Sequence, residues 1–274
     1  MVHGLSSYLN SNHHLTTAWL DKVARAGVEV VELFCARQSL DYRNPAQIAE
    51  LGYWFRDSPL RPHSLHLPLY SDDCGGRTGP QASINICHTE RDRRRDSVDE
   101  IKRALEIAEQ VPCGYAIQHL GTGDETYEDR KLDAAFSSLE ELNVFARDRG
   151  IEILLENIPN ALSSAERLLE FLEQTHLDNF LCFDIGHAHL GEGVEPAFER
   201  MKDRIRSTHI HDNDGSGDTH GFPQSGSIDW PAAMRLLRSR QSQYPLLLEL
   251  REPVGGSNPL DMVLQTFDQL EELE

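Results

Sequence analysis

Four side chains that can bind a metal follow short apolar segments of the sequence. Glu156 ends the run Ile-Glu-Ile-Leu-Leu-Glu, Asp184 ends Leu-Cys-Phe-Asp, His209 follows Ser-Thr, and Glu249 ends Leu-Leu-Leu-Glu. If they converge, their carboxylates repel one another, and a cation is the natural counter-charge. An oxygen-rich set with one imidazole suits Zn²⁺, Mn²⁺ or Mg²⁺. For any one of these residues taken alone, the alternative is a charged side chain that is simply solvated where the strand ends. The four together favour a divalent metal site.

A second set of candidate metal ligands lies at or just beyond the same kind of segment. His187 follows the β-rich run Phe180–Asp184 in the pattern Asp-x-x-His. Asp218 and His220 form an Asp-Thr-His motif after the next such run, Ile205–His211. His66 and His119 lie at the ends of two earlier β-rich runs, Pro62–Leu67 and Gly114–His119. A single histidine at a strand end also serves as a hydrogen-bonded or substrate contact, so both roles stay open for His66 and His119.

Other polar features of the chain are given no catalytic role. His211 is two residues after His209, so on a strand both side chains would point to the same face. It is expected to lie beyond the sheet, however, and is left unassigned. The basic cluster Arg91–Arg95 is interpreted as a solvated helix face, with a phosphate contact as the alternative. The sequence holds no GxGxxG, phosphate-loop or GxSxG motif. Six histidines are interpreted as surface or structural: His13, His14, His63, His88, His176 and His189.

The elements that would position these residues alternate along the whole chain. Short β-rich runs are separated by amphipathic segments with apolar residues three or four apart, as in Leu132–Phe145 and Leu260–Leu270. Gly27 and Gly150 stand where helix-ending glycines are expected. Eight such repeats predict an α/β fold, a single (β/α)₈ TIM barrel formed by residues 1–274. The predicted strands are Val2–Tyr8, Val28–Phe34, Pro62–Leu67, Gly114–His119, Ile151–Glu156, Phe180–Asp184, Ile205–His211 and Pro245–Leu250.

Composition limits the possible partners and compartment. The 274 residues carry a formal net charge of −19, which disfavours nucleic acid and anionic membranes as partners. No apolar run approaches the length needed to span a bilayer. The five cysteines are scattered and form no CxxC pair, which is typical of a reducing, cytoplasmic location. One long irregular segment, Pro68–Thr89, follows the third strand and is expected to act as a lid.

The chain resembles the xylose-isomerase-like TIM-barrel superfamily over nearly its whole length. This superfamily includes sugar and sugar-phosphate isomerases and epimerases, and abasic-site endonucleases of the endonuclease IV type. The resemblance rests on Leu155-Glu-Asn157, Phe183-Asp-Ile-Gly-His187, the run His209–Gly215 with Asp218-x-His220, Gly226–Trp230 and Leu248-Glu-Leu250.

The two branches imply different metal sites. In the isomerase and epimerase branch, the positions of Glu156, Asp184, His209 and Glu249 hold one divalent metal. The endonuclease branch uses nine ligands for three zinc ions, and this chain has a suitable residue at every matching position. The nine are His66, His119, Glu156, Asp184, His187, His209, Asp218, His220 and Glu249.

The resemblance leads to one preferred function and two alternatives. We expect a divalent-metal-dependent isomerase or epimerase of a sugar, sugar phosphate or polyol, acting by proton transfer through a metal-stabilised enediolate. Glu156 and Glu249 would be base and acid, and His187 would orient a substrate oxygen. The first alternative is an abasic-site endonuclease, against which the strand-seven motif His-Ile-His-Asp-Asn-Asp-Gly counts. The second is a non-catalytic metal- or sugar-binding barrel. Substrate, native metal and oligomeric state are left open.

Overall fold

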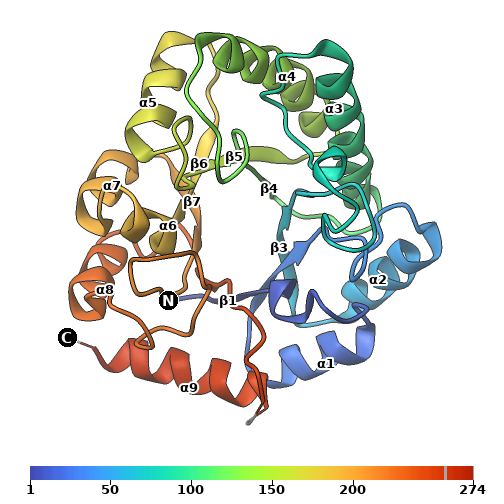
Figure 1. The fold of residues 1–274 in the computed structure, drawn as a ribbon. Coiled ribbons are helices and arrows are strands. Elements are labelled where there is room, and N and C mark those ends of the chain that lie inside the picture. The colour runs from blue at the N-terminus through green and yellow to red at the C-terminus, as the bar shows by residue number, and fades with distance from the viewer. Residues whose placement is uncertain (256–257, 274) are drawn as a thin grey trace.

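Eight parallel strands form the centre of the molecule in the computed structural model, which describes residues 1–255 and 258–273 (Figure 1). The strands follow one another in the order β7-β6-β5-β4-β3-β2-β1-β8. Each predicted strand is present, usually shorter than expected. The strands are β1 (His3–Ser6), β2 (Val30–Phe34), β3 (Arg61–His66), β4 (Tyr115–Gln118), β5 (Glu152–Glu156), β6 (Phe180–Asp184), β7 (Ile205–His209) and β8 (Leu246–Leu248).

The sheet closes between β7 and β8, through a residue just beyond β7. The Ile210 amide donates to the Leu247 carbonyl at 2.9 Å, and the Glu249 amide donates to the Ile210 carbonyl at 3.2 Å. This single parallel bridge turns the sheet into a barrel and confirms the predicted (β/α)₈ class.

Helices surround the strands (Figure 1). Both glycines predicted to end helices have left-handed backbones, with φ of 77° at Gly27 and 74° at Gly150. One helix beyond the predicted alternation is present, because the β6–β7 connection holds both α6 and α7. The helices of the described residues are α1 (Thr17–Arg25), α2 (Pro45–Asp57), α3 (Arg91–Leu105), α4 (Asp129–Arg147), α5 (Ala165–Gln174), α6 (Ile185–Leu190), α7 (Val194–Met201), α8 (Trp230–Arg238) and α9 (Pro259–Glu272). Three 3₁₀ turns accompany them at Ser7–Asn10, Pro80–Ala82 and Glu106–Glu109.

Alternation of side chains along the strands places the candidate ligands inside the barrel. Ile117, Leu154 and Cys182 are fully buried and pack together in its interior. Successive side chains on a strand point to opposite faces, so residues two positions further along face the same way. Glu156 follows Leu154, and Asp184 follows Cys182, at that spacing. The apolar packing therefore determines that these carboxylates point inward at the carboxyl-terminal rim.

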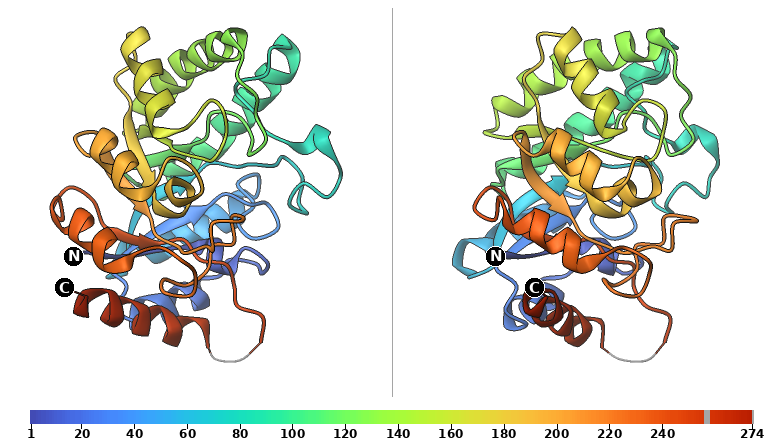
Figure 2. Two further views of the ribbon diagram at one scale, coloured as in Figure 1. Left: turned by 60° about the vertical axis from the view of Figure 1, so that its left-hand side comes forward. Right: turned by 90° about the vertical axis from the view of Figure 1, so that its left-hand side faces the viewer.

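The two ends of the barrel differ in character. Met1 and the end of α9 lie close together at one end, where the Met1 ammonium is 3.5 Å from Glu271 (Figure 2). The connections that follow β3 and β7 extend from the opposite end (Figure 2). No helix in the described part of the chain is long and apolar enough to cross a membrane.

Candidate metal centre and active site

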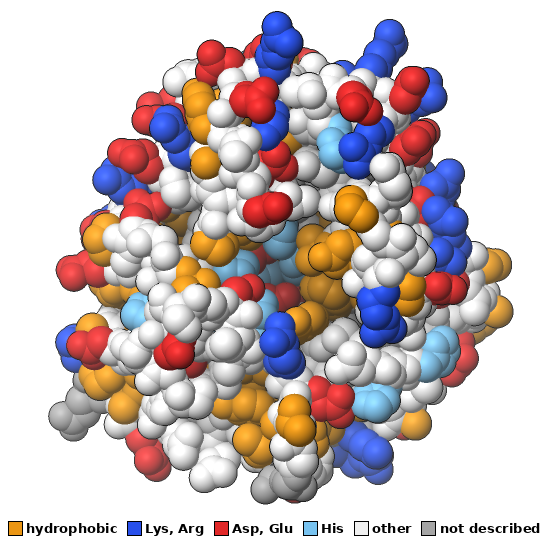
Figure 3. Space-filling view, viewed as in Figure 1, with side chains coloured by type: hydrophobic (Ala, Val, Ile, Leu, Met, Phe, Trp, Pro, Cys, Tyr) orange, Lys and Arg blue, Asp and Glu red, His pale blue; other side chains and the backbone are white. Residues whose placement is uncertain are grey.

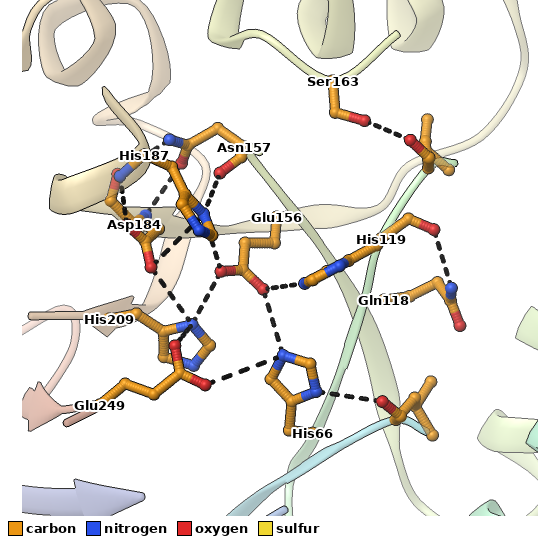
Figure 4. Close-up of polar contacts among 12 residues, drawn as sticks. His66, Gln118, His119, Glu156, Asn157, Ser163, Asp184, His187, His209 and Glu249 are labelled. Atoms are coloured by element: carbon orange, nitrogen blue, oxygen red, sulfur yellow. Dashed lines mark hydrogen bonds and ion pairs between the residues drawn. The ribbon is translucent and has the colours of Figure 1, made fainter. Parts of the chain in front are cut away.

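Glu156 lies at the centre of a buried cluster at the carboxyl ends of the strands (Figure 4). Its Oε1 is 2.9 Å from His209 Nδ1, and its Oε2 is 2.8 Å from His119 Nε2. His209 Nδ1 is also 3.3 Å from Glu249 Oε2 and 3.8 Å from Asp184 Oδ2. The four strand-end residues, Glu156, Asp184, His209 and Glu249, therefore come together as the sequence predicts, and we call them the strand-end cluster.

Three of the histidines are oriented in a way that suits metal binding. The Nδ1 atoms of His66, His187 and His220 lie 3.0–3.1 Å from the carbonyl oxygens of Leu67, Asn157 and Glu249, respectively. A ring that donates from Nδ1 to a carbonyl leaves Nε2 as the free lone pair, the arrangement usual for metal-bound histidine. In all three residues, Nε2 faces a carboxylate of the site.

A second group of ligand atoms lies beside the strand-end cluster and comes mainly from the β7–α8 connection. Asp218 Oδ2 is 3.2 Å from His187 Nε2 and 3.1 Å from His220 Nε2. His211, left unassigned from the sequence, belongs to the same group of mutually close ligand atoms. We call His187, His211, Asp218 and His220 the loop cluster. Two further groups consist of His66, His119 and Glu156, and of His66, His209 and Glu249.

His211 reaches the loop cluster because position 186 has no side chain. A Cβ added at Gly186 would lie 2.0 Å from His211 Cε1, so any larger residue there would displace the ring. His211 Nε2 is 3.1 Å from Asp184 Oδ2, and its ring stacks on His220 with centroids 4.1 Å apart. His211 thus connects the two clusters, a contact that the expected position beyond the sheet did not reveal.

Glu32 is a further site residue that the sequence interpretation missed. It lies in the middle of β2, is fully buried, and its Oε2 accepts from His209 Nε2 at 3.1 Å and from Ser64 Oγ at 2.8 Å. A carboxylate behind a histidine fixes the ring and its tautomer, which leaves His209 Nδ1 directed at the strand-end cluster. The available signal was a charged residue within the apolar run Val-Val-Glu-Leu-Phe.

The motif that follows β7 shapes the loop that carries Asp218 and His220. The carboxylate of Asp212 accepts from Trp230 Nε1 at 2.7 Å and from the amides of Gly226 and Ile228 at 3.0 and 3.3 Å. His220 itself has a left-handed backbone, with φ of 48°, which is costly for a residue with a side chain. The loop therefore holds His220 in a conformation that its own backbone does not favour.

Charge pairing governs ionisation of the cluster. Burial opposes the charge on Glu156, but the nearby His209 and His119 hold its pKa well below the usual glutamate range. Burial lowers the pKa of His187, but Asp184 and Asp218 raise it well above the usual histidine value. Burial raises the pKa of Glu32, but His209 brings it down to about 2. Glu156 and Glu32 thus stay ionised, and the site needs positive charge beside them, supplied by protons or by a metal.

A cavity of about 450 Å³ opens above these residues, and seven of the nine predicted ligands line it. They are His66, His119, Glu156, His187, Asp218, His220 and Glu249. Figure 3 shows the hollow, with histidine and acidic side chains at its bottom. Within the strand-end cluster, Glu156 and Glu249 line the cavity, whereas Asp184 and His209 lie beneath it. The loop Pro68–Thr89 contributes Leu69, Tyr70 and Arg77 to the wall, and an antiparallel bridge between Tyr70 and Ser83 organises it.

The donor set fits a divalent metal. Each candidate group gathers imidazole and carboxylate ligand atoms within 4.8 Å of one another, and most of these residues are buried. Such N/O sets suit Zn²⁺ or Mn²⁺, and burial without a cation would leave several carboxylates to be neutralised by protons alone. The fold and this site define a barrel with a candidate metal centre at its carboxyl-terminal rim.

Comparison with known proteins identifies the family. Residues 20–273 match the family described as xylose isomerase-like TIM barrel, and the chain belongs to it. A solved structure described as a D-tagatose 3-epimerase-like protein superposes with a TM-score of 0.78 at 25% identity, covering 100% of this chain and 97% of that one.

Several curated relatives have assigned activities. Fructoselysine 3-epimerase of Escherichia coli O157:H7 is 29% identical over 57% of this chain and 60% of its own length. A probable endonuclease 4 of Natronomonas pharaonis is 25% identical over 64% of this chain and 70% of its own length. The chain spans about half the length, 53%, of another relative, an uncharacterized protein of Sinorhizobium fredii.

Proposed function

We propose that this protein is a divalent-metal-dependent isomerase or epimerase of a sugar, sugar phosphate or related polyol. The observation that carries the proposal is that the residues of the strand-end cluster lie at two different depths. Glu156 and Glu249 line the cavity, whereas Asp184 and His209 lie beneath it. Two carboxylates that can reach a small molecule, above two groups that cannot, suit proton transfer over a bound metal.

The residues would share the reaction as follows. Glu156, Asp184, His209 and Glu249 would hold the ion. When bound, a divalent ion supplies positive charge that favours loss of the proton next to a carbonyl. One of Glu156 and Glu249 would remove that proton, and the other would deliver a proton to the opposite face of the substrate. His187 would orient a substrate oxygen, because it lines the cavity while the Asn157 carbonyl holds its Nδ1.

The size of the cavity and the charge of the chain favour a small substrate. A volume of about 450 Å³ lies within the range of ordinary small-molecule sites. The net charge of −19 opposes the approach of a nucleic acid. The 3-epimerases among the relatives support the same class of reaction.

Solvent exchange tests the proposal directly. The metal-loaded protein is incubated in D₂O with a panel of ketoses, ketose phosphates and keto polyols, and the products are analysed by NMR. We expect deuterium at the carbon next to the carbonyl, together with an epimer or an aldose. Metal-loaded protein that exchanges no proton on any member of the panel would contradict the proposal.

A second candidate, an abasic-site endonuclease, is favoured by a specific observation. The four groups of close ligand atoms together include all nine residues that resemble the trinuclear zinc set, and His211 as well. Metal analysis and an abasic-duplex incision assay separate the candidates. One ion per chain without incision favours the isomerase, whereas three zinc ions with metal-dependent incision favour the nuclease.

A further inference from the structure

Two arginines stand in the wall of the cavity whose floor is acidic. Arg251 follows β8 and Arg77 belongs to the loop after β3, and they are the lysine or arginine residues among those that line the cavity. Figure 3 shows basic side chains beside the hollow, with acidic side chains deeper inside. The cavity therefore combines a floor of carboxylates and imidazoles with guanidinium groups in its wall.

Local structure holds both arginines at the cavity. The Arg251 amide donates to the His220 carbonyl at 2.9 Å, which fixes the backbone two residues beyond Glu249. The ring of Tyr8, another lining residue, lies 4.8 Å from that of His220. Arg77 lies in a turn tied by Asp72, whose carboxylate accepts from the amides of Gly76 and Thr78 at 2.7 and 3.1 Å.

Neither guanidinium forms an ion pair within the described residues, although the chain is strongly acidic. Eight other arginines form ion pairs within the described residues, whereas others, such as Arg91 and Arg130, do not. The eight are Arg37, Arg43, Arg95, Arg103, Arg149, Arg167, Arg200 and Arg240. Arg251 also interacts with Tyr8, which lines the same cavity. Two cavity-lining guanidinium groups that form no ion pair with the described carboxylates can donate to a ligand, and guanidinium suits the planar recognition of phosphate or carboxylate.

We propose that Arg251 and Arg77 form an anion subsite, which binds a phosphate or carboxylate group at the end of the substrate distant from the strand-end cluster. This inference rests on the proposed function and narrows its substrate to an anionic sugar derivative. The carbonyl end would lie on Glu156 and Glu249, and the charged end would lie between the two guanidinium groups.

Substrate selectivity tests the subsite. Solvent-deuterium exchange is measured for neutral ketoses, ketose phosphates and keto-sugar acids, with wild type, Arg251→Gln and Arg77→Gln. The matched control is Arg91→Gln, which removes an equal charge from an exposed position at the start of α3. We expect anionic substrates to be preferred, and the ratio of kcat/KM for anionic over neutral substrates to fall about tenfold to a hundredfold in Arg251→Gln, mainly through KM. The control should keep the wild-type ratio.

A binding measurement keeps the test independent of turnover. Calorimetric titration of wild type and Arg251→Gln with a ketose phosphate and with a keto-sugar acid gives both dissociation constants and shows which anion is preferred. Weaker binding in the variant supports the subsite even if no sugar shows exchange. The absence of exchange would then contradict the proposed isomerase function but not the anion subsite. Equal dissociation constants, or an unchanged selectivity ratio beside active turnover of neutral ketoses, would overturn the subsite and leave the isomerase proposal standing.

Discussion

The strand-end cluster and the loop cluster use similar ligands but are held in different ways. Glu156, Asp184 and His209 are fully buried at the ends of consecutive strands, and the barrel's own hydrogen bonds fix their spacing. Asp218 belongs to a long connection, and 35% of its side chain is exposed. The difference teaches that the strand-end cluster is preorganised by the fold, whereas the loop cluster depends on a separate scaffold around Asp212. We therefore expect the strand-end cluster to bind its ion more tightly and to matter more for turnover.

The largest effect should follow from replacing the two cavity-lining glutamates of the strand-end cluster. Glu156→Gln or Glu249→Gln should reduce turnover and solvent-deuterium exchange by about 10²–10⁴-fold, because each change removes a proton-transfer group. Folding should survive, since stability of such barrels lies mainly elsewhere. Glu152→Gln, at the exposed start of the same β5 strand, is the matched control. A Glu156→Gln protein with wild-type exchange would exclude the assigned role.

A smaller effect should follow from changing the carboxylate behind the strand-end cluster. Glu32→Gln should weaken metal affinity about tenfold to a hundredfold, because an amide orients His209 less firmly than a carboxylate does. Competition with a fluorescent chelator measures the affinity, and circular dichroism checks the fold. Wild-type affinity in a folded Glu32→Gln protein would show that β2 does not support the metal site.

Protons should compete with metal at both clusters. The pKa of His187 and of His209 is raised well above the usual histidine value in the metal-free protein, since nearby carboxylates outweigh burial. Metal must displace these protons, so affinity should fall by about tenfold per pH unit for each proton displaced, as pH decreases through the raised values. Chelator competition between pH 6 and 9 measures the slope. A flat profile would mean that neither ring is protonated in the metal-free protein.

The raised pKa values of His187 and His209 also determine how the stability of the metal-free protein changes with pH. A histidine whose folded-state pKa is raised stabilises the fold at low pH, and the stabilisation is lost as pH rises through that raised value. Metal-free protein should therefore lose thermal stability on the alkaline side, whereas metal-loaded protein should not. Thermal unfolding of both forms across that range provides the measurement.

The smallest effect on turnover should come from the loop cluster. Asp218→Asn should remove one ion where the loop cluster holds one, and it should lower turnover only a few-fold, because the proton-transfer pair remains intact. Elemental analysis of the variant beside wild type counts the ions. A loss of activity as deep as that of Glu156→Gln would erase the distinction between the two clusters and would favour the three-ion nuclease.

The sequence was sufficient to predict the barrel and the strand-end cluster because both follow from local patterns. Strand ends at one rim converge in any parallel barrel, so Glu156, Asp184, His209 and Glu249 could be grouped without coordinates. Glu32 was missed because its partner, His209, is distant in the sequence and adjacent only across the barrel interior. His211 was missed because its placement depends on Gly186 and on the fold of one loop. Such contacts are set by packing across the barrel, which strand and helix periodicity does not encode.

The way in which the barrel closes has a consequence for how the molecule comes apart. β7 and β8 share one backbone bridge, through Ile210, to which the Thr208 hydroxyl adds a hydrogen bond to the Pro245 carbonyl. His209 and Glu249 lie on the two sides of that bridge. An ion shared by these two side chains would act as a cross-link over the weakest join in the sheet. Hydrogen exchange at the Ile210 and Glu249 amides would then slow when metal is added, far more than at the β4–β5 pair. Metal supply would thus set the lifetime of the folded protein as well as its activity.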